Sequence, residues 1–184
     1  MSGCVRLAKL VSAVIHPPSV TALAIAVISS EYRLDAAAVA EALAFIAALP
    51  VAPVVASAAS GRTDLNVSRR EERPWYLAAA LASYLVALAL LDEVQPLARL
   101  ARAYFMVTLG VLAASLRVKV SIHVAGLVGP TIALAIEAGA AYLLLLLLLP
   151  VVWWARLKLR AHSSRELALG AAIAALLTAL SYML

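Results

Sequence analysis

The sequence predicts an all-α protein, a polytopic bundle of transmembrane helices that forms a single domain over residues 1–184. Of the 184 residues, 65% are hydrophobic and only 14% are charged, whereas ordinary soluble domains carry about 25% charged residues. The mean hydropathy is +1.00. The apolar residues also fall in blocks of about 15 to 25, near the length that crosses a bilayer. Because helices satisfy their own backbone hydrogen bonds in lipid, such blocks indicate membrane-spanning helices.

Seven apolar segments follow one another along the chain, and we expect each of them to cross the membrane. They are residues 10–30, 36–56, 75–91, 97–116, 124–136, 140–154 and 167–184. The fifth and sixth segments are shorter than the roughly 20 residues of a full crossing. Six spans are therefore the alternative, in which residues 121–155 form one long tilted helix, but seven spans are preferred.

Prolines and short polar turns mark the ends and bends of these segments. Pro17 and Pro18 fit the first turn of a helix, where the N–H groups lack intrahelical partners anyway. Pro50 and Pro53 are expected to bend the second segment. Polar turns at residues 31–35, 92–96 and 137–139 separate neighbouring segments.

Three basic junctions between the apolar segments carry the side chains best suited to chemistry. They cover residues 62–74, 117–123 and 156–166. With seven spans, two crossings separate each junction from the next, so all three can meet on one membrane face. Together they offer four cations, two histidines and a hydroxyl: Arg69, Arg73, Lys119, Arg156, His123, His162 and Ser121. Fixed positive donors of this kind suit the negative oxygens of a phosphoryl group.

The third junction has the most informative spacing. His162 and Glu166 are four residues apart and share a face if a helix begins there, so the carboxylate can hold the imidazole in one tautomer. Arg156 adds a planar fork suited to phosphate. No metal or other cofactor is expected, because the chain has a single cysteine and the nearby cations would repel a metal ion. His16 is interpreted as an interfacial side chain.

The ordered set of residues resembles the type-2 phosphatidic-acid phosphatase superfamily of membrane lipid phosphatases. Its three motifs are Lys, six residues, Arg-Pro; then Pro-Ser-Gly-His; then Ser-Arg, five residues, His, three residues, Asp. The matching positions in this chain are Arg73-Pro74, Ser121-Ile122-His123, and Arg156, His162 and Glu166. The resemblance spans residues 62–166, and the flanking apolar segments agree with the helical bundle of that family.

The chain departs from the family pattern at several positions. Asn66 stands where the family has its first Lys, and we expect Arg69 to replace that charge from the same helical face as Arg73. Val120 and Ile122 stand for the Pro and Gly of the second motif. In the third motif Ala155 replaces Ser, and Glu replaces Asp at position 166.

The resemblance implies a metal-independent phosphoryl transfer in two steps. His162 would attack phosphorus and form a phosphohistidine, while Glu166 orients its ring. His123 would protonate the leaving alcohol and then activate water. The phosphate oxygens would be held by Arg69, Arg73, Lys119, Ser121 and Arg156.

The sequence therefore predicts a membrane phosphatase whose substrate is a lipid phosphate monoester or pyrophosphate with an isoprenoid or glycerolipid chain. Its partners are this lipid and the bilayer rather than nucleic acid, because the net charge of +5 gathers at the ends of the apolar blocks. The alternatives are a non-catalytic membrane protein, either a transporter or a lipid-binding scaffold, and a family relative that has lost catalysis. The oligomeric state is left open.

The distribution of positive charge predicts the orientation. With the N-terminus and the three junctions on one face, all but three of the 15 Lys and Arg side chains lie there, the exceptions being Arg33, Arg99 and Arg102. Cytoplasmic loops carry such an excess, so the predicted active site faces the cytoplasm.

Overall fold

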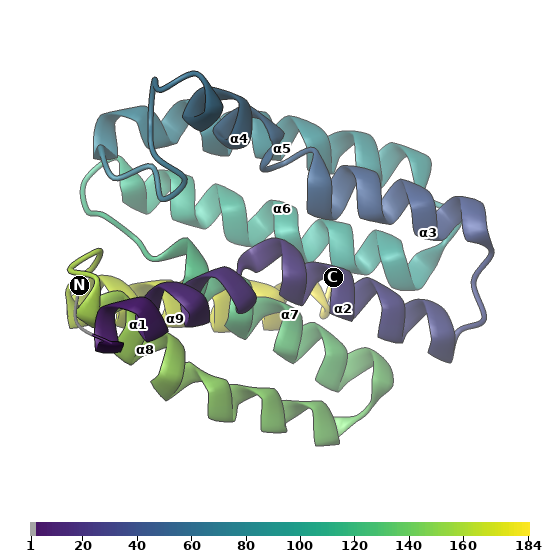
Figure 1. Ribbon diagram of the computed structural model, residues 1–184. Helices are drawn as coiled ribbons and strands as arrows, with labels where there is room; N and C mark the ends of the chain where they lie inside the picture. The colour runs from purple at the N-terminus through teal and green to yellow at the C-terminus, as the bar shows by residue number, and fades with distance from the viewer. Residues whose placement is uncertain (1–2) are drawn as a thin grey trace.

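A computed structural model describes residues 3–184, and this part of the chain is helical, with short connections (Figure 1). The helices are α1 (Gly3–Val14), α2 (Pro17–Glu31), α3 (Ala36–Ala42), η1 (Leu43–Ala48), α4 (Ala52–Ala59), η2 (Arg70–Glu72), α5 (Arg73–Leu90), α6 (Gln95–Ser115), α7 (Ile122–Ala138), η3 (Ala140–Leu148), α8 (Leu149–Lys158) and α9 (Ser164–Ser181). The prediction of an all-α bundle is confirmed.

Helix α7 is the centre of the bundle. It packs against α2, α6, α8, α9 and η3, and most of its residues are buried. Small residues allow the close contacts, as is common between membrane helices. A Cβ atom on Gly126 would lie 2.7 Å from Cβ of Pro17 in α2, and one on Gly129 would lie 3.2 Å from Oγ1 of Thr178 in α9.

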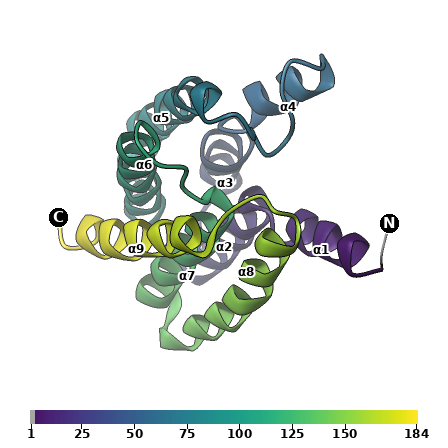
Figure 2. The same ribbon diagram turned by 90° about the vertical axis from the view of Figure 1, so that its left-hand side faces the viewer.

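The chain reverses direction after α7 and does not continue as one long helix. Gly139 has a φ of +117°, which glycine adopts without a steric penalty. Residues 140–158 then run back alongside α7 (Figures 1 and 2). Residues 121–155 therefore form a helical hairpin, so the second and third junctions lie at the same end of the bundle.

The second apolar segment is bent, as Pro50 and Pro53 predict. It begins as α3, widens into the π-helix η1 and breaks before α4, with a bend of 50° between the two halves. The hydroxyl of Ser83 in α5 donates to the carbonyl of Phe45 in the π-helix, at 2.7 Å. The bend tilts α4 away from α3, and α4 buries none of its own residues.

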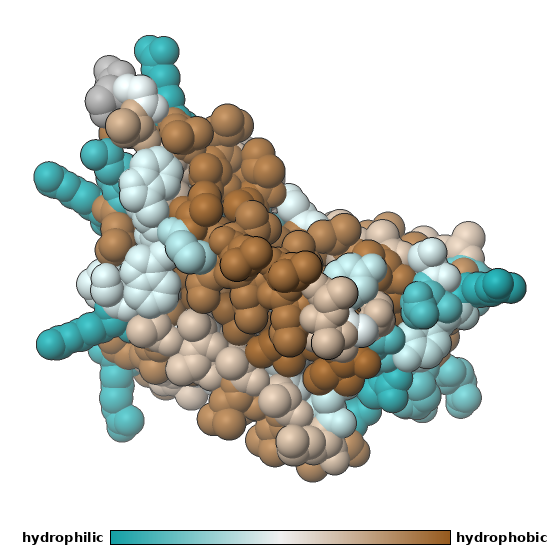
Figure 3. Space-filling view, turned by 90° about the horizontal axis from the view of Figure 1, so that it is seen from below, coloured by the Kyte–Doolittle hydropathy of each residue, from teal (hydrophilic) through white to brown (hydrophobic). Residues whose placement is uncertain are grey.

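Within residues 3–184, five helical stretches are long and apolar enough to cross a membrane, and the bent pair would make six. They are Gly3–Glu31, Arg70–Leu90, Gln95–Ser115, Ala140–Lys158 and Ser164–Ser181, with Ala36–Ala48 and Ala52–Ala59 as the pair. Helix α7 is apolar but has only 17 residues. Figure 3 shows a broad apolar surface between two polar ends, as expected of a protein embedded in a bilayer.

The three basic junctions meet at one end of the bundle, onto which Figure 2 looks. Helices α5, α7 and α9 all start there, while α8 ends there beside α1. At the opposite end Glu137 of α7 accepts two hydrogen bonds from Arg99 of α6, both 2.9 Å long, and one of 2.8 Å from the hydroxyl of Tyr32. This network ties the distal end of α7 to its neighbours.

Candidate functional site

A cavity of about 640 Å³ lies at the end of the bundle where the basic junctions meet. Its polar lining includes eight side chains from seven helices or connections: Lys9, Ser12, His16, Asn66, Arg73, His123, Arg156 and His162. Among the described residues, no Asp or Glu lines it. The polar part of the cavity is therefore basic, and it brings together five polar residues of the three predicted motif regions: Asn66, Arg73, His123, Arg156 and His162.

His162 and Glu166 form the pair that the sequence predicts. Nδ1 of His162 lies 3.0 Å from Oε2 of Glu166. The same Oε2 accepts from the backbone N–H of Ser163, at 3.1 Å, and Oγ of Ser163 accepts from the N–H of Glu166. This capping box begins α9 just after His162. Because the carboxylate holds Nδ1, the nitrogen left for a ligand in the cavity is Nε2.

Arg156 is almost fully buried in the wall of the cavity, at 1% exposure. Its Nη1 donates to Oδ1 of Asn66 at 3.0 Å and to Oγ of Ser12 at 3.2 Å. Its Nε is buried and has no hydrogen-bond partner in the described part of the chain. A buried guanidinium with an unused donor is costly unless a ligand accepts from it, so Arg156 is well placed for an anion.

Arg73 joins two of the junctions through backbone carbonyls. Its Nε donates to Val67 at 3.1 Å, and its Nη1 donates to Val120 at 2.6 Å. The guanidinium is buried and lines the cavity. Arg73 therefore holds the loop before α5 against the start of α7 while adding positive charge to the cavity wall.

Lys119 and Ser121 lie behind the cavity and do not line it. Nζ of Lys119 donates to the carbonyl of Ala161, at 2.9 Å, next to His162. Ser121 is the N-cap of α7, and its Oγ accepts from the N–H of Val124 at 3.4 Å. A Cβ on Gly170 would lie 2.7 Å from the Ser121 carbonyl oxygen, so α9 approaches this cap closely. In this geometry both residues fix the second motif region beside the third.

Arg69 lies outside the cavity, contrary to the expectation that it shares a helical face with Arg73. It has extended backbone angles and precedes the single 3₁₀ turn η2, so no continuous α-helix joins the two residues. Its guanidinium is exposed, donates to the carbonyl of Arg62 and pairs with Glu72. Asn66, where the family has its Lys, lines the cavity instead and contacts Arg156.

His123 lies in the first turn of α7 and is 7% exposed. Its ring lies edge-on to that of His16, with the centroids 5.0 Å apart and the planes at 88°. His16 is therefore part of the cavity wall and not an isolated interfacial side chain. The sequence gives one signal for its placement, the following Pro17-Pro18, which fixes its backbone.

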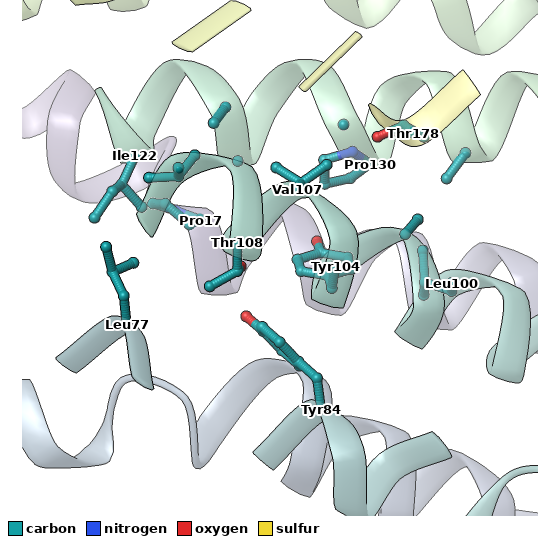
Figure 4. A pocket seen from close by; sticks show the side chains of 16 residues that line it. Pro17, Leu77, Tyr84, Leu100, Tyr104, Val107, Thr108, Ile122, Pro130 and Thr178 are labelled. Carbon is teal, nitrogen blue, oxygen red and sulfur yellow. The ribbon is translucent and has the colours of Figure 1, made fainter. Parts of the chain in front are cut away.

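Apart from Tyr76, Tyr84 and Thr108, the rest of the cavity wall is apolar and extends along the bundle. Val51, Val54 and Val55 face it from the bent segment, and Leu77 and Ala80 face it from α5. A narrower space of about 70 Å³ continues between α5, α6 and α7. Figure 4 shows Leu77, Tyr84, Thr108 and Ile122 around this space, and the same four residues also line the larger cavity.

Burial lowers the pKa of His162 below its ordinary value of 6.5, against the opposing effect of the Glu166 hydrogen bond, and the charges of Arg156, Arg73 and Lys119 lower it further. Burial, followed by the charge of Arg73, also lowers the pKa of Lys119. His162 is therefore neutral at pH 7, as a nitrogen nucleophile must be.

This pKa shift predicts a loss of stability in mild acid. Below pH 6.5 the unfolded chain binds a proton at His162 that the folded protein does not, so stability falls with pH until the lowered folded pKa is reached, by at most about 1.4 kcal/mol per pH unit. Thermal unfolding in detergent is measured at pH 7.5 and at pH 5. The unfolding temperature should fall less between these two pH values for H162N than for the wild type. Equal falls in the two proteins would contradict the shift.

No group of three or more His, Cys, Asp or Glu side chains within residues 3–184 is placed to hold a metal ion. Comparison of the chain with protein-family models, curated proteins and solved structures found no match. The chemistry of the site therefore has to be argued from its own residues.

Proposed function

We propose that this protein is a membrane phosphatase that hydrolyses a lipid phosphate monoester or pyrophosphate through a phosphohistidine. One observation carries the proposal: a histidine oriented by a carboxylate, His162 with Glu166, lines the same basic cavity as a second histidine and a buried arginine with an unused donor. These are the parts that phosphoryl transfer needs, namely a nucleophile, an acid–base group and fixed positive charge.

The first step transfers the phosphoryl group to the enzyme. Nε2 of His162 attacks phosphorus, and the bond from phosphorus to the lipid oxygen breaks. Burial and the charge of Arg156 lower the pKa of His123, so His123 takes up a proton when the negative phosphate oxygens enter beside it. It then gives this proton to the lipid oxygen, which leaves as an alcohol or, from a pyrophosphate, as the lipid monophosphate. Glu166 accepts a hydrogen bond from Nδ1 and stabilises the charge that develops on the ring.

The second step returns the enzyme to its starting state. His123, now neutral, takes a proton from water, and the resulting hydroxide attacks phosphorus. The bond from phosphorus to Nε2 breaks and inorganic phosphate leaves. Arg156 and Arg73 stabilise the negative oxygens in both steps, while Lys119 and Ser121 hold the loops that carry the two histidines. We leave Arg69 out of the phosphate-binding set because its exposed guanidinium binds the Arg62 carbonyl and the Glu72 carboxylate instead.

The apolar part of the cavity suits the hydrocarbon chain of the substrate. A lipid phosphate must place its charge at the membrane surface and its tail in apolar surroundings. The basic end of the cavity lies at the end of the bundle, and the valines and leucine of its wall continue toward the bundle interior. The same arrangement would suit a lipid-binding scaffold, which differs from an enzyme in releasing no phosphate.

We further propose that all seven segments cross the membrane. The 17 residues of α7 cover roughly 26 Å of a hydrocarbon layer about 30 Å thick. In the returning arm, η3 is a 3₁₀ helix, which rises about 2.0 Å per residue. With α8 it covers roughly 33 Å, so a short apolar segment is stretched enough to cross.

The positive-charge distribution further supports a site on the cytoplasmic face. Ser60 lies exposed at the end of α4, two residues before the first junction, and the free Cys4 is also exposed. A Ser60→Cys protein in a Cys4→Ser background should resist an impermeant maleimide in intact cells and react in inverted vesicles. Labelling of intact cells alone would place the site on the outer face.

The test of the proposed function is phosphate release by the purified protein in detergent micelles. Dioleoyl phosphatidic acid and farnesyl pyrophosphate serve as probes of the glycerolipid and isoprenoid classes. We expect turnover of at least one probe, with the same rate in the presence of excess EDTA. Saturable binding of both lipids without phosphate release would favour a lipid-binding scaffold, and loss of activity with EDTA would contradict the metal-independent mechanism.

A further inference from the structure

His16 is a cavity residue that lies outside all three basic junctions. It lies between α1 and α2, more than 100 residues before His123 in the chain. Its ring nevertheless lies edge-on to the ring of His123, with centroids 5.0 Å apart. Aromatic rings favour this edge-to-face arrangement at separations of about 4.5 to 7 Å, so the contact constrains how the His123 ring can turn.

The backbone of His16 is held in place independently of its ring. Pro17 and Pro18 occupy the first turn of α2, and a residue before proline is restricted to extended backbone angles. His16 has φ −87° and ψ 146°, and although it is the N-cap, its side chain makes no capping hydrogen bond. The ring is therefore free for the contact with His123.

Gly126 allows this segment to reach α7. It lies one turn after His123, and a Cβ at this position would lie 2.7 and 2.8 Å from Cβ and Cγ of Pro17. Such distances are not tolerated without a shift. The start of α2 therefore rests directly on the helix face that also carries His123.

We propose that His16 is a positioning residue for His123. Open cavity space adjoins the His123 ring, and the packed ring of His16 limits the rotations that this space would otherwise permit. A fixed ring keeps its nitrogen at the distance from the leaving oxygen that proton transfer requires. This inference rests on the proposed function, because it assigns His16 a part in the acid–base role of His123.

The test compares His16→Ala and His16→Phe with the wild type, using whichever lipid phosphate the wild type hydrolyses faster. His16→Ala removes the packed ring and should lower kcat about 10- to 100-fold with KM within about threefold, because a misplaced catalytic group slows the chemical steps more than binding. His16→Phe retains a flat ring without nitrogens and should restore most of the lost kcat. Ser19→Ala, an exposed change in the first turn of α2, is the matched control.

Gly126→Ala provides a second route that leaves His16 itself intact. It should displace Pro17, and with it His16, and lower kcat in the same way as His16→Ala. Wild-type kcat in His16→Ala, or a His16→Phe protein as slow as His16→Ala, would overturn the proposal. Failure of the proposed function is distinguishable, since the wild type would then release no phosphate at all.

Discussion

Replacing His162 with alanine is expected to reduce phosphate release by about 10⁴-fold or more, because removing the nucleophile of a two-step reaction removes the covalent route altogether. His162 is buried, faces the cavity and is oriented through Nδ1. The measurement is steady-state phosphate release in detergent micelles. Folding is checked by thermal unfolding of each variant.

Three further measurements test whether His162 acts as the nucleophile. Ser164→Ala changes the exposed first residue of α9, two positions after His162, and should retain wild-type activity. Added imidazole should partly restore turnover in His162→Gly, because the free base can enter the space of the missing ring and accept the phosphoryl group. An alkaline quench of the wild type during turnover should trap phosphate on the protein. Alkali is used because phosphohistidine is hydrolysed in acid. Near-normal turnover by a folded His162→Ala protein would exclude the mechanism.

Replacing His123 with alanine is expected to slow alkyl phosphate hydrolysis by about 10² to 10⁴-fold, the usual contribution of a general acid–base group. The effect should depend on the leaving group. A lipid alcohol needs a proton as it leaves, whereas p-nitrophenolate does not, so the first step with p-nitrophenyl phosphate should proceed at close to its normal rate in His123→Ala.

The second step gives His123→Ala a distinctive signature. With p-nitrophenyl phosphate, the variant should release a burst of about one nitrophenolate per protein and then turn over slowly, because no base activates the water that cleaves the phosphohistidine. His162→Ala should show no burst. Equal losses for alkyl and aryl phosphates in His123→Ala, without a burst, would show that His123 does not act on the leaving group.

The pairing of His162 with Glu166 could be predicted from the sequence because it is local. A spacing of four residues at a helix start brings the two side chains together whatever the rest of the fold does. The structure adds that Glu166 also closes the capping box of α9, so one carboxylate both starts the helix and orients the imidazole.

The replacement of the family's first Lys could not be predicted from spacing. Arg69 looked suitable because four residues separate it from Arg73, but this argument requires a helix between them. The chain there is an extended residue followed by a single 3₁₀ turn, and the charge of Glu72 draws Arg69 outward. Asn66 reaches the cavity because the loop folds back onto Arg73 and Arg156.

By itself the sequence determined the helical class, the apolar segments and the local His162–Glu166 pair, because hydropathy and spacing act over a few turns of one helix. Only the tertiary structure decided that residues 121–155 turn back at Gly139, and that His16 packs against His123. Those contacts join segments far apart in the chain, and they depend on a reversal and on close helix approaches that small residues permit at Gly126 and Gly170. The physical reason is that the order of apolar and polar residues determines which face of each helix is buried. Which other helix that face contacts depends on the packing of the whole bundle.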